Sequence, residues 1–328
     1  MSQEDAPPPG PGEEEEDAPP SGEHTRMRSP FITPRASYEE LEIRAFDGAR
    51  LRAIVEEPPD GTSIRASVVL AHAMFARKSS FGRRGKPGLA RALADRGLRA
   101  IAFDFRGHGD SAPPPGESWA YDDLVRSDLP AVVDYARAQD ELPVLVLGHS
   151  LGGHVALAAQ GTKPLADAIV LASTNVWHRS LEPSRLRWAA KLAIASAMLL
   201  GSERANGLRA RRLRLGTDDA SAAYIRDLVR ITLQDRWRSA DGHDDYLEAL
   251  ASIRIPVASV LANDDHILCH PAVGEAFVRR CGGPIEIFRT AGGHMATVTG
   301  DPAPALAAVE WALAQVNERR ASRAGSST

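Results

Sequence analysis

The sequence contains little cysteine. Among its 328 residues only Cys269 and Cys281 occur, and neither stands in a spacing that is typical of metal ligands. Two cysteines are too few for the disulfide framework of a small secreted domain, so we expect free thiols in a reducing compartment. The sequence predicts neither a metal nor a cofactor.

Long apolar runs are also missing. The most apolar stretch, Trp188 to Leu200, is interrupted by Lys191 and is shorter than the roughly 18 residues that a transmembrane helix needs. The first residues lack the positively charged start and apolar segment of a secretory signal. We therefore expect no membrane span and a cytoplasmic location.

Neither sign of charge dominates. The chain carries 39 Lys and Arg against 43 Asp and Glu, a formal net charge of -4. A protein that binds nucleic acid usually has a marked basic excess, so we expect no nucleic acid partner. The oligomeric state is not predicted by these features.

Both ends of the chain have the composition of unfolded segments. Residues 1–36 are rich in Pro, Gly and Glu and include four consecutive glutamates, Glu13 to Glu16. Such a segment buries too little apolar surface to offset its chain entropy, so a disordered tail is predicted. Residues 318–328 are predicted to form a second, frayed tail.

Between these tails, short apolar runs alternate with helical patterns. The alternation predicts a mostly parallel sheet covered by helices on both faces, a fold of the α/β class. The core is assigned to residues 37–175 and 253–317. The predicted strands are 41–46, 51–56, 67–72, 99–103, 144–147, 168–172, 255–261 and 285–288, and the predicted helices are 89–96, 121–138, 151–160, 271–280 and 302–317.

The interval 176–252 is too long for a simple connection and too helical for a disordered loop, so it is predicted to form a cap or lid. The cap is rich in arginine. A solvated face is the favoured interpretation of these residues, and the alternative is contact with an anionic substrate or an acidic lipid head group. The arginines are Arg185, Arg187, Arg209, Arg211, Arg212 and Arg214.

The most informative motif follows the strand 144–147. Gly148, Ser150 and Gly152 form the pattern G-x-S-x-G between a buried strand and an alanine-rich helix. Glycines on either side allow the strand and the helix to approach closely, while the serine between them takes strained backbone angles. The hydroxyl is then exposed at the start of a helix, beside free backbone N–H groups. The competing interpretation is an ordinary helix-capping serine.

The segment Gly-His-Ser-Leu-Gly-Gly at 148–153 resembles the nucleophile elbow of the α/β-hydrolase superfamily. The resemblance covers about residues 40–316. It implies an α/β-hydrolase fold with a helical cap insertion, and a catalytic triad in the chain order Ser, Asp, His. Ser150 is then the nucleophile.

The same resemblance supplies the other two residues of the triad. After the strand 255–261, the sequence Ala-Asn-Asp-Asp is similar to the family's acid loop and makes Asp265 the triad acid, with Asp264 as the alternative. After the strand 285–288, Ala-Gly-Gly-His resembles the family's histidine loop and makes His294 the general base. The spacing of 29 positions from Asp265 to His294 accommodates one helix and one strand.

An oxyanion hole requires two preorganised donors. The backbone N–H of Leu151 is the first. By resemblance to the family's oxyanion loop, His72-Ala-Met at 72–74 makes Met74 the second, although Ala73 replaces the usual glycine and leaves Phe75 as the alternative donor.

Other residues near these motifs are assigned structural roles. The segment Asp104 to Ser111 resembles a further family signature, in which Arg106 connects loops. His72, His149 and His154 are expected to pack or to anchor loops, because they share no metal-ligand spacing with carboxylates.

These features predict a serine hydrolase, carboxylesterase- or lipase-like, that cleaves a small-molecule acyl ester or a related acyl bond through an acyl-enzyme. Two alternatives remain open. An acyltransferase would pass the same acyl group to an acceptor other than water, and a hydrolase-like protein without catalysis would only bind its ligand.

Overall fold

The structure, a computed structural model, describes residues 38–116 and 118–325. These residues form one compact unit. The predicted tail at residues 1–36 lies outside the described residues.

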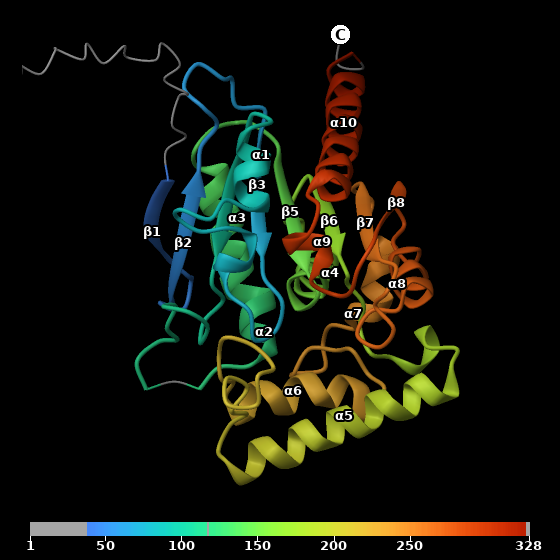
Figure 1. Ribbon diagram of the computed structural model, residues 1–328. Coiled ribbons are helices and arrows are strands. Elements are labelled where there is room, and N and C mark those ends of the chain that lie inside the picture. Colours follow the sequence, from blue (N-terminus) through green and yellow to red (C-terminus); the bar gives the residue numbers. More distant parts are fainter. Residues whose placement is uncertain (1–37, 117, 326–328) are drawn as a thin grey trace, which may run out of the picture. The chain divides into compact units, whose positions relative to one another are not determined.

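The centre of this unit is an eight-stranded sheet with the order β1-β2-β4-β3-β5-β6-β7-β8 (Figure 1). β1 and β2 form an antiparallel hairpin around Gly48, and β2 also pairs antiparallel with β4, whereas every other neighbouring pair is parallel. The predicted α/β-hydrolase fold is therefore confirmed. The strands are β1 (Tyr38–Arg44), β2 (Arg50–Glu56), β3 (Ala66–Ala71), β4 (Leu98–Phe103), β5 (Val144–His149), β6 (Ala168–Ala172), β7 (Val257–Ala262) and β8 (Ile285–Thr290).

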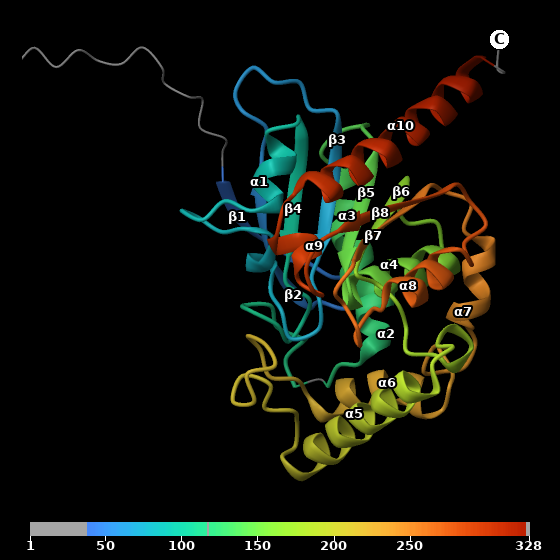
Figure 2. The same cartoon turned by 45° about the vertical axis from the view of Figure 1, so that its right-hand side comes forward.

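Helices cover both faces of the sheet (Figures 1 and 2). In β5, Leu145 and Leu147 belong to a core cluster that includes residues of α1 and α10, whereas Val144 and Val146 belong to a second cluster that includes residues of α3, α4 and α8. This alternation explains why the central strands are continuous apolar runs, since both of their faces are buried. The covering helices are α1 (Leu89–Ala94), α3 (Leu129–Arg137), α4 (Leu151–Thr162), α8 (Pro271–Val278) and α10 (Ala303–Gly325), with α2 (Tyr121–Asp123) and a π-helical turn, Leu124–Asp128, leading into α3.

The final helix corrects one expectation. α10 continues to Gly325, so residues 318–325 are helical and not frayed; the remainder of the predicted tail lies outside the described residues. Arg319 Nη1 donates to the Arg254 carbonyl at 2.7 Å, and Arg320 Nη1 donates to the Glu141 carbonyl at 3.3 Å. These side chains attach a polar helical end to two loops of the core.

The interval 176–252 is helical. α5 (Arg185–Arg204) packs against α6 (Ala222–Leu233), and the two lie side by side in Figures 1 and 2. The short helix α7 (Tyr246–Ala249) packs against α4 of the core instead. Loops between these helices reach the segments that follow the carboxyl ends of the strands, as at Thr217, which bonds to Phe75 after β3.

A polar cluster is buried where α4 meets α2 and the segment after α6. Trp237 Nε1 donates to the Tyr121 hydroxyl at 3.2 Å, and that hydroxyl donates to His154 Nδ1 at 2.9 Å. Burial lowers the pKa of His154 to about 3, so its ring is neutral in the folded protein. The predicted packing role of His154 agrees with these contacts.

Replacing Gly152 should destabilise the fold. A Cβ at this position would lie 2.2 Å from the Ala71 carbonyl oxygen, so Gly152→Ala should lower the free energy of unfolding by about 1–3 kcal/mol, the usual cost of overpacking. Urea-induced unfolding measures the change. The matched control is Gly201→Ala in α5, where the added Cβ meets Leu208 Cδ1 at an ordinary 3.6 Å. Equal stability of the two variants would contradict the close approach of α4 to β3.

The neutral state of His154 should make stability depend on pH. Unfolded histidine binds a proton below about pH 6.5, whereas folded His154 stays neutral down to about pH 3. The free energy of unfolding should therefore fall as the pH drops from 6.5, by roughly 1 kcal/mol per pH unit from this residue. His154→Gln should reduce the slope between pH 6 and 5 by that amount in urea titrations, and an unchanged slope would refute the assignment.

Candidate active site

Ser150 lies on the sharp bend between β5 and α4. Its backbone has φ 52° and ψ -111°, a left-handed region that costs a non-glycine residue about 1–3 kcal/mol. The Ser150 N–H donates to the Ala172 carbonyl at the end of β6 at 2.9 Å, and the Ser150 carbonyl accepts from Gly153 N–H at 3.0 Å. Bonds to a neighbouring strand and to the first turn of α4 thus hold the strained residue in place.

The glycines around Ser150 permit this bend because they allow backbone to lie against backbone. A Cβ at Gly148 would lie 2.4 Å from Gly153 Cα, and a Cβ at Gly153 would lie 2.1 Å from Thr174 Oγ1. Side chains at these positions would separate β5, α4 and the segment after β6. Gly152, where a Cβ would lie 2.2 Å from the Ala71 carbonyl oxygen, is the second glycine of G-x-S-x-G, so both glycines of the motif have a steric reason.

The structure brings Asp265 and His294 together. His294 Nδ1 lies 2.5 Å from Asp265 Oδ2, and the Asp265 side chain is 3% exposed. Burial raises the pKa of Asp265, but the hydrogen bond and charge of His294 and the backbone N–H groups of Leu268 and Cys269 outweigh it, so the pKa lies below its ordinary value. The carboxylate is therefore charged at neutral pH and orients the imidazole.

Asp264, the alternative acid, has a different partner. Its Oδ2 accepts the Gly292 N–H at 2.9 Å, and its own N–H donates to the Gly292 carbonyl at 3.0 Å. These two bonds connect the loop after β7 to the loop after β8. Asp264 thereby supports the loop that carries His294 without contacting the imidazole through any described hydrogen bond.

His149 connects the His294 loop to the bend at Ser150. Its Nε2–H donates to the His294 carbonyl at 3.1 Å, and the two rings lie 5.0 Å apart between centroids. Burial, with a smaller contribution from the nearby His294, lowers the pKa of His149 to about 3. The neutral His149 ring, directly before Ser150, thus positions the loop that carries His294. This contact agrees with the anchoring role expected for His149.

The candidate oxyanion donors lie on two segments. Leu151 is the first residue of α4 and is buried, and the first N–H groups of a helix have no partner within it. Met74 is half-buried on the loop after β3, next to Phe75, which is buried and has φ 60°. Met74 and Phe75 are therefore both candidates for the second donor. The loop that connects β3 to η1 (Lys78–Phe81) is strained at Phe75.

His72 and Arg106 anchor the loops around the site. His72 Nδ1–H donates to the Ala73 carbonyl at 2.8 Å while Nε2 accepts from Phe105 N–H at 3.1 Å, which requires a neutral ring. Arg106 is 2% exposed and lies 2.7 Å from carboxylates of both Asp47 and Asp128. These contacts agree with the structural roles expected for both residues.

One set of contacts has no signal in the sequence. Arg77, after β3, forms an ion pair with Asp218 in the cap, although 141 positions separate them. Neither residue belongs to a recognisable motif. Only the folded chain brings the cap segment 216–218 to the candidate oxyanion loop.

Two surface pockets lie near Lys78 and Asp110, and none of Ser150, Asp265 and His294 lines either one. We place the candidate chemistry at the triad residues, because the strain and the buried hydrogen bond are found there. Within the described ranges, no cluster of three His, Cys, Asp or Glu side chains has a metal-binding arrangement, and no helix is long and apolar enough to cross a membrane.

Comparison with curated proteins gives partial matches. An sn-1-specific diacylglycerol lipase of Mus musculus, ABHD11, is 29% identical over 106 residues, which are 32% of this chain and 31% of the relative. The ABHD12B protein of Homo sapiens is 35% identical over 102 residues, 28% and 26% of the two chains. The chain thus matches about a third or less of the length of these relatives.

Solved structures share the fold over most of their length. An α/β hydrolase from Penicillium, GrgF, superposes with a TM-score of 0.58 at 16% identity and covers 84% of this chain and 98% of its own. An esterase from Pyrococcus furiosus gives 0.54 at 18% identity, with 80% and 85% covered. At these identities the likeness concerns the fold alone.

A family model matches most of the core together with the cap. The model of Hydrolase_4, described as serine aminopeptidase S33, matches residues 62–293, more than two thirds of the chain. Its match begins before β3 and ends directly before His294, so it includes the bend at Ser150 and the loop of Asp265. With the sheet order and the solved neighbours, this match shows that the chain belongs to the Hydrolase_4 family of the α/β-hydrolase superfamily.

Proposed function

We propose that this protein is a serine hydrolase that cleaves a carboxylic ester or a related acyl bond through an acyl-enzyme at Ser150. The observation that carries the proposal is the 2.5 Å contact between His294 and the buried Asp265. The loop that carries His294 is hydrogen-bonded to His149, the residue directly before Ser150. A charged carboxylate, an imidazole and a strained serine, which follow β7, β8 and β5 at the same edge of the sheet, are the components of nucleophilic acyl transfer.

The roles follow from the chemistry of each group. A neutral hydroxyl is a weak nucleophile, so His294 takes the proton of Ser150 as its oxygen attacks the carbonyl carbon. Asp265 holds the imidazole in the tautomer that carries hydrogen on Nδ1 and stabilises the imidazolium that forms. His294 then gives the proton to the leaving group, and a water molecule activated by the same ring releases the acyl group.

The tetrahedral intermediate carries a negative charge that needs donors already in place. Leu151 N–H and one N–H from Met74 or Phe75 supply them in this proposal. Removing such a donor typically costs about 3 kcal/mol of transition-state stabilisation. Backbone donors suit this task because the loops that carry them are fixed by hydrogen bonds to the core and the cap.

An ester is the favoured substrate class. One curated relative is named as a diacylglycerol lipase, and one solved neighbour is an esterase. The family description names an aminopeptidase, which makes an amide the second candidate. Parallel assays with p-nitrophenyl acetate and alanine p-nitroanilide distinguish the two bonds, since each releases a coloured product only when its own bond is cleaved.

Ser150→Ala should lower kcat for p-nitrophenyl acetate by at least 1000-fold, because the residual rate then depends on the remaining groups alone. Steady-state kinetics measure the change, and circular dichroism should show an unaltered fold. Ser79→Ala, at an exposed serine of η1, is the matched control and should retain full activity. Comparable activity of both variants would remove Ser150 from the mechanism.

The two neighbouring carboxylates offer a direct test of the triad acid. Asp265→Asn should reduce kcat by about 1000- to 10,000-fold, since an amide beside Nδ1 favours the wrong tautomer. Asp264→Asn should have a much smaller effect, because Asp264 bonds only to the backbone of Gly292 in the described contacts. A larger loss in Asp264→Asn than in Asp265→Asn would reverse the assignment.

A further inference from the structure

Residues of the cap hold the loop that carries the second candidate oxyanion donor in place. Phe75 has φ 60°, although it is not a glycine, and its side chain is buried. Within its own loop, the Ala76 N–H donates to the Ala73 carbonyl at 3.1 Å. A strained conformation of this kind persists only where surrounding groups fix it.

Thr217 supplies the first of these groups. Its N–H donates to the Phe75 carbonyl at 2.7 Å. Its hydroxyl lies 3.1 Å from the same carbonyl and 2.9 Å from Asp218 Oδ2, and can donate to one of them at a time. The cap therefore holds the carbonyl of the strained residue directly.

Gly216 shows how closely the two segments approach. A Cβ at this position would lie 2.4 Å from both the Cβ and the carbonyl oxygen of Phe75. Any side chain larger than hydrogen would push the cap segment away from the loop. The distance between the cap segment and the loop therefore requires glycine at position 216.

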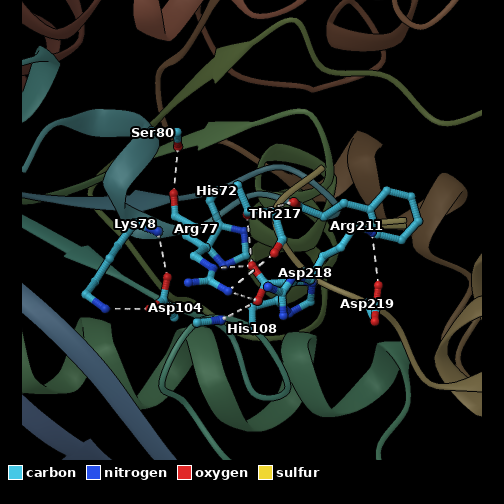
Figure 3. Close-up of polar contacts among 12 residues, drawn as sticks. His72, Arg77, Lys78, Ser80, Asp104, His108, Arg211, Thr217, Asp218 and Asp219 are labelled. Carbon is cyan, nitrogen blue, oxygen red and sulfur yellow. Dashed lines mark hydrogen bonds and ion pairs between the residues drawn. The ribbon is translucent and has the colours of Figure 1, made fainter. Parts of the chain in front are cut away.

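Asp218 completes the attachment (Figure 3). Arg77 donates to both of its carboxylate oxygens, at 2.5 and 2.6 Å, in the two-pronged geometry that gives ion pairs their directional specificity. The Gly109 N–H, from the loop after β4, donates to the same carboxylate at 3.1 Å. Burial raises the pKa of Asp218, but the Arg77 hydrogen bonds and charge, with Thr217 and Gly109, bring it below its ordinary value.

We propose that Asp218 is a positioning residue, through which the cap segment Gly216–Asp218 holds the oxyanion loop 73–77 in its catalytic conformation. The inference rests on the proposed function. The cap then takes part in catalysis, because it fixes the backbone donor that stabilises the oxyanion. Since that charge develops in the transition state, loosening the attachment should lower kcat and leave KM unchanged.

The test compares Asp218→Asn with Asp219→Asn, both assayed with p-nitrophenyl acetate. Active sites are counted by a fluorophosphonate probe, so that kcat refers to reactive serine and not to total protein. Asp218→Asn should lower kcat per labelled site by about 10- to 100-fold, the range expected for a displaced oxyanion donor, with KM within twofold of the wild type. Asp219 is exposed and accepts only the Arg211 N–H in the described contacts, so its variant should match the wild type.

Two further variants separate positioning from simple support of the fold. Arg77→Gln should reproduce the loss, and the double variant Arg77→Gln with Asp218→Asn should be no slower than either single one, because both remove the same attachment. Thr217→Val is the variant to assay if Asp218→Asn fails to fold. It removes the hydroxyl but keeps the backbone N–H that donates to the Phe75 carbonyl, so it should lower kcat per labelled site by a smaller factor than the about 10- to 100-fold expected for Asp218→Asn.

Each result has one meaning. An unchanged kcat per labelled site in Asp218→Asn, or in Thr217→Val where the former does not fold, overturns the positioning role and leaves the proposed function standing. Losses that multiply in the double variant also overturn it. Absence of labelling and turnover in the wild type overturns the proposed function, and the positioning role with it.

Discussion

The bend at Ser150 is the constraint on which the rest of the site depends. A serine at φ 52° is held between the end of β6 and the first turn of α4 by backbone hydrogen bonds. The bend exists because Gly148, Gly152 and Gly153 let the backbones of β3, β5 and α4 approach to distances that any side chain would prevent. The strained backbone of Ser150 lowers the stability of the fold locally. The sheet, which helices cover on both faces, supplies the stability that offsets this strain.

The remaining groups follow other strands that end at the same edge of the sheet as β5. β7 leads to Asp265, β8 leads to His294, and β3 leads to the candidate oxyanion loop. Because parallel strands end at the same edge of a sheet, residues far apart in the chain arrive together there. Buried neutral histidines complete this arrangement, as His149 donates to the His294 carbonyl and His72 to the Ala73 carbonyl.

Most of the fold could be predicted from the sequence because its signals are local. Buried strands are apolar runs and the helices between them have their own periodicity, so the order of elements and the bend at Ser150 followed directly. Loop detail could not be predicted in the same way. The choice between Asp264 and Asp265 depends on which carboxylate faces the imidazole, and the pairing of Arg77 with Asp218 depends on a cap that folds back over 141 residues. The helical end of α10 could not be predicted from its own sequence, because its anchors, such as the Arg254 carbonyl, lie elsewhere in the chain.

The most direct test of the account is the identity of the residue that forms the covalent intermediate. The protein is treated with a fluorophosphonate, digested, and its peptides are analysed by tandem mass spectrometry. A single adduct is expected on Ser150, and it should be absent when the protein is unfolded before labelling. An adduct on another residue, or folded protein that stays unlabelled, would contradict it.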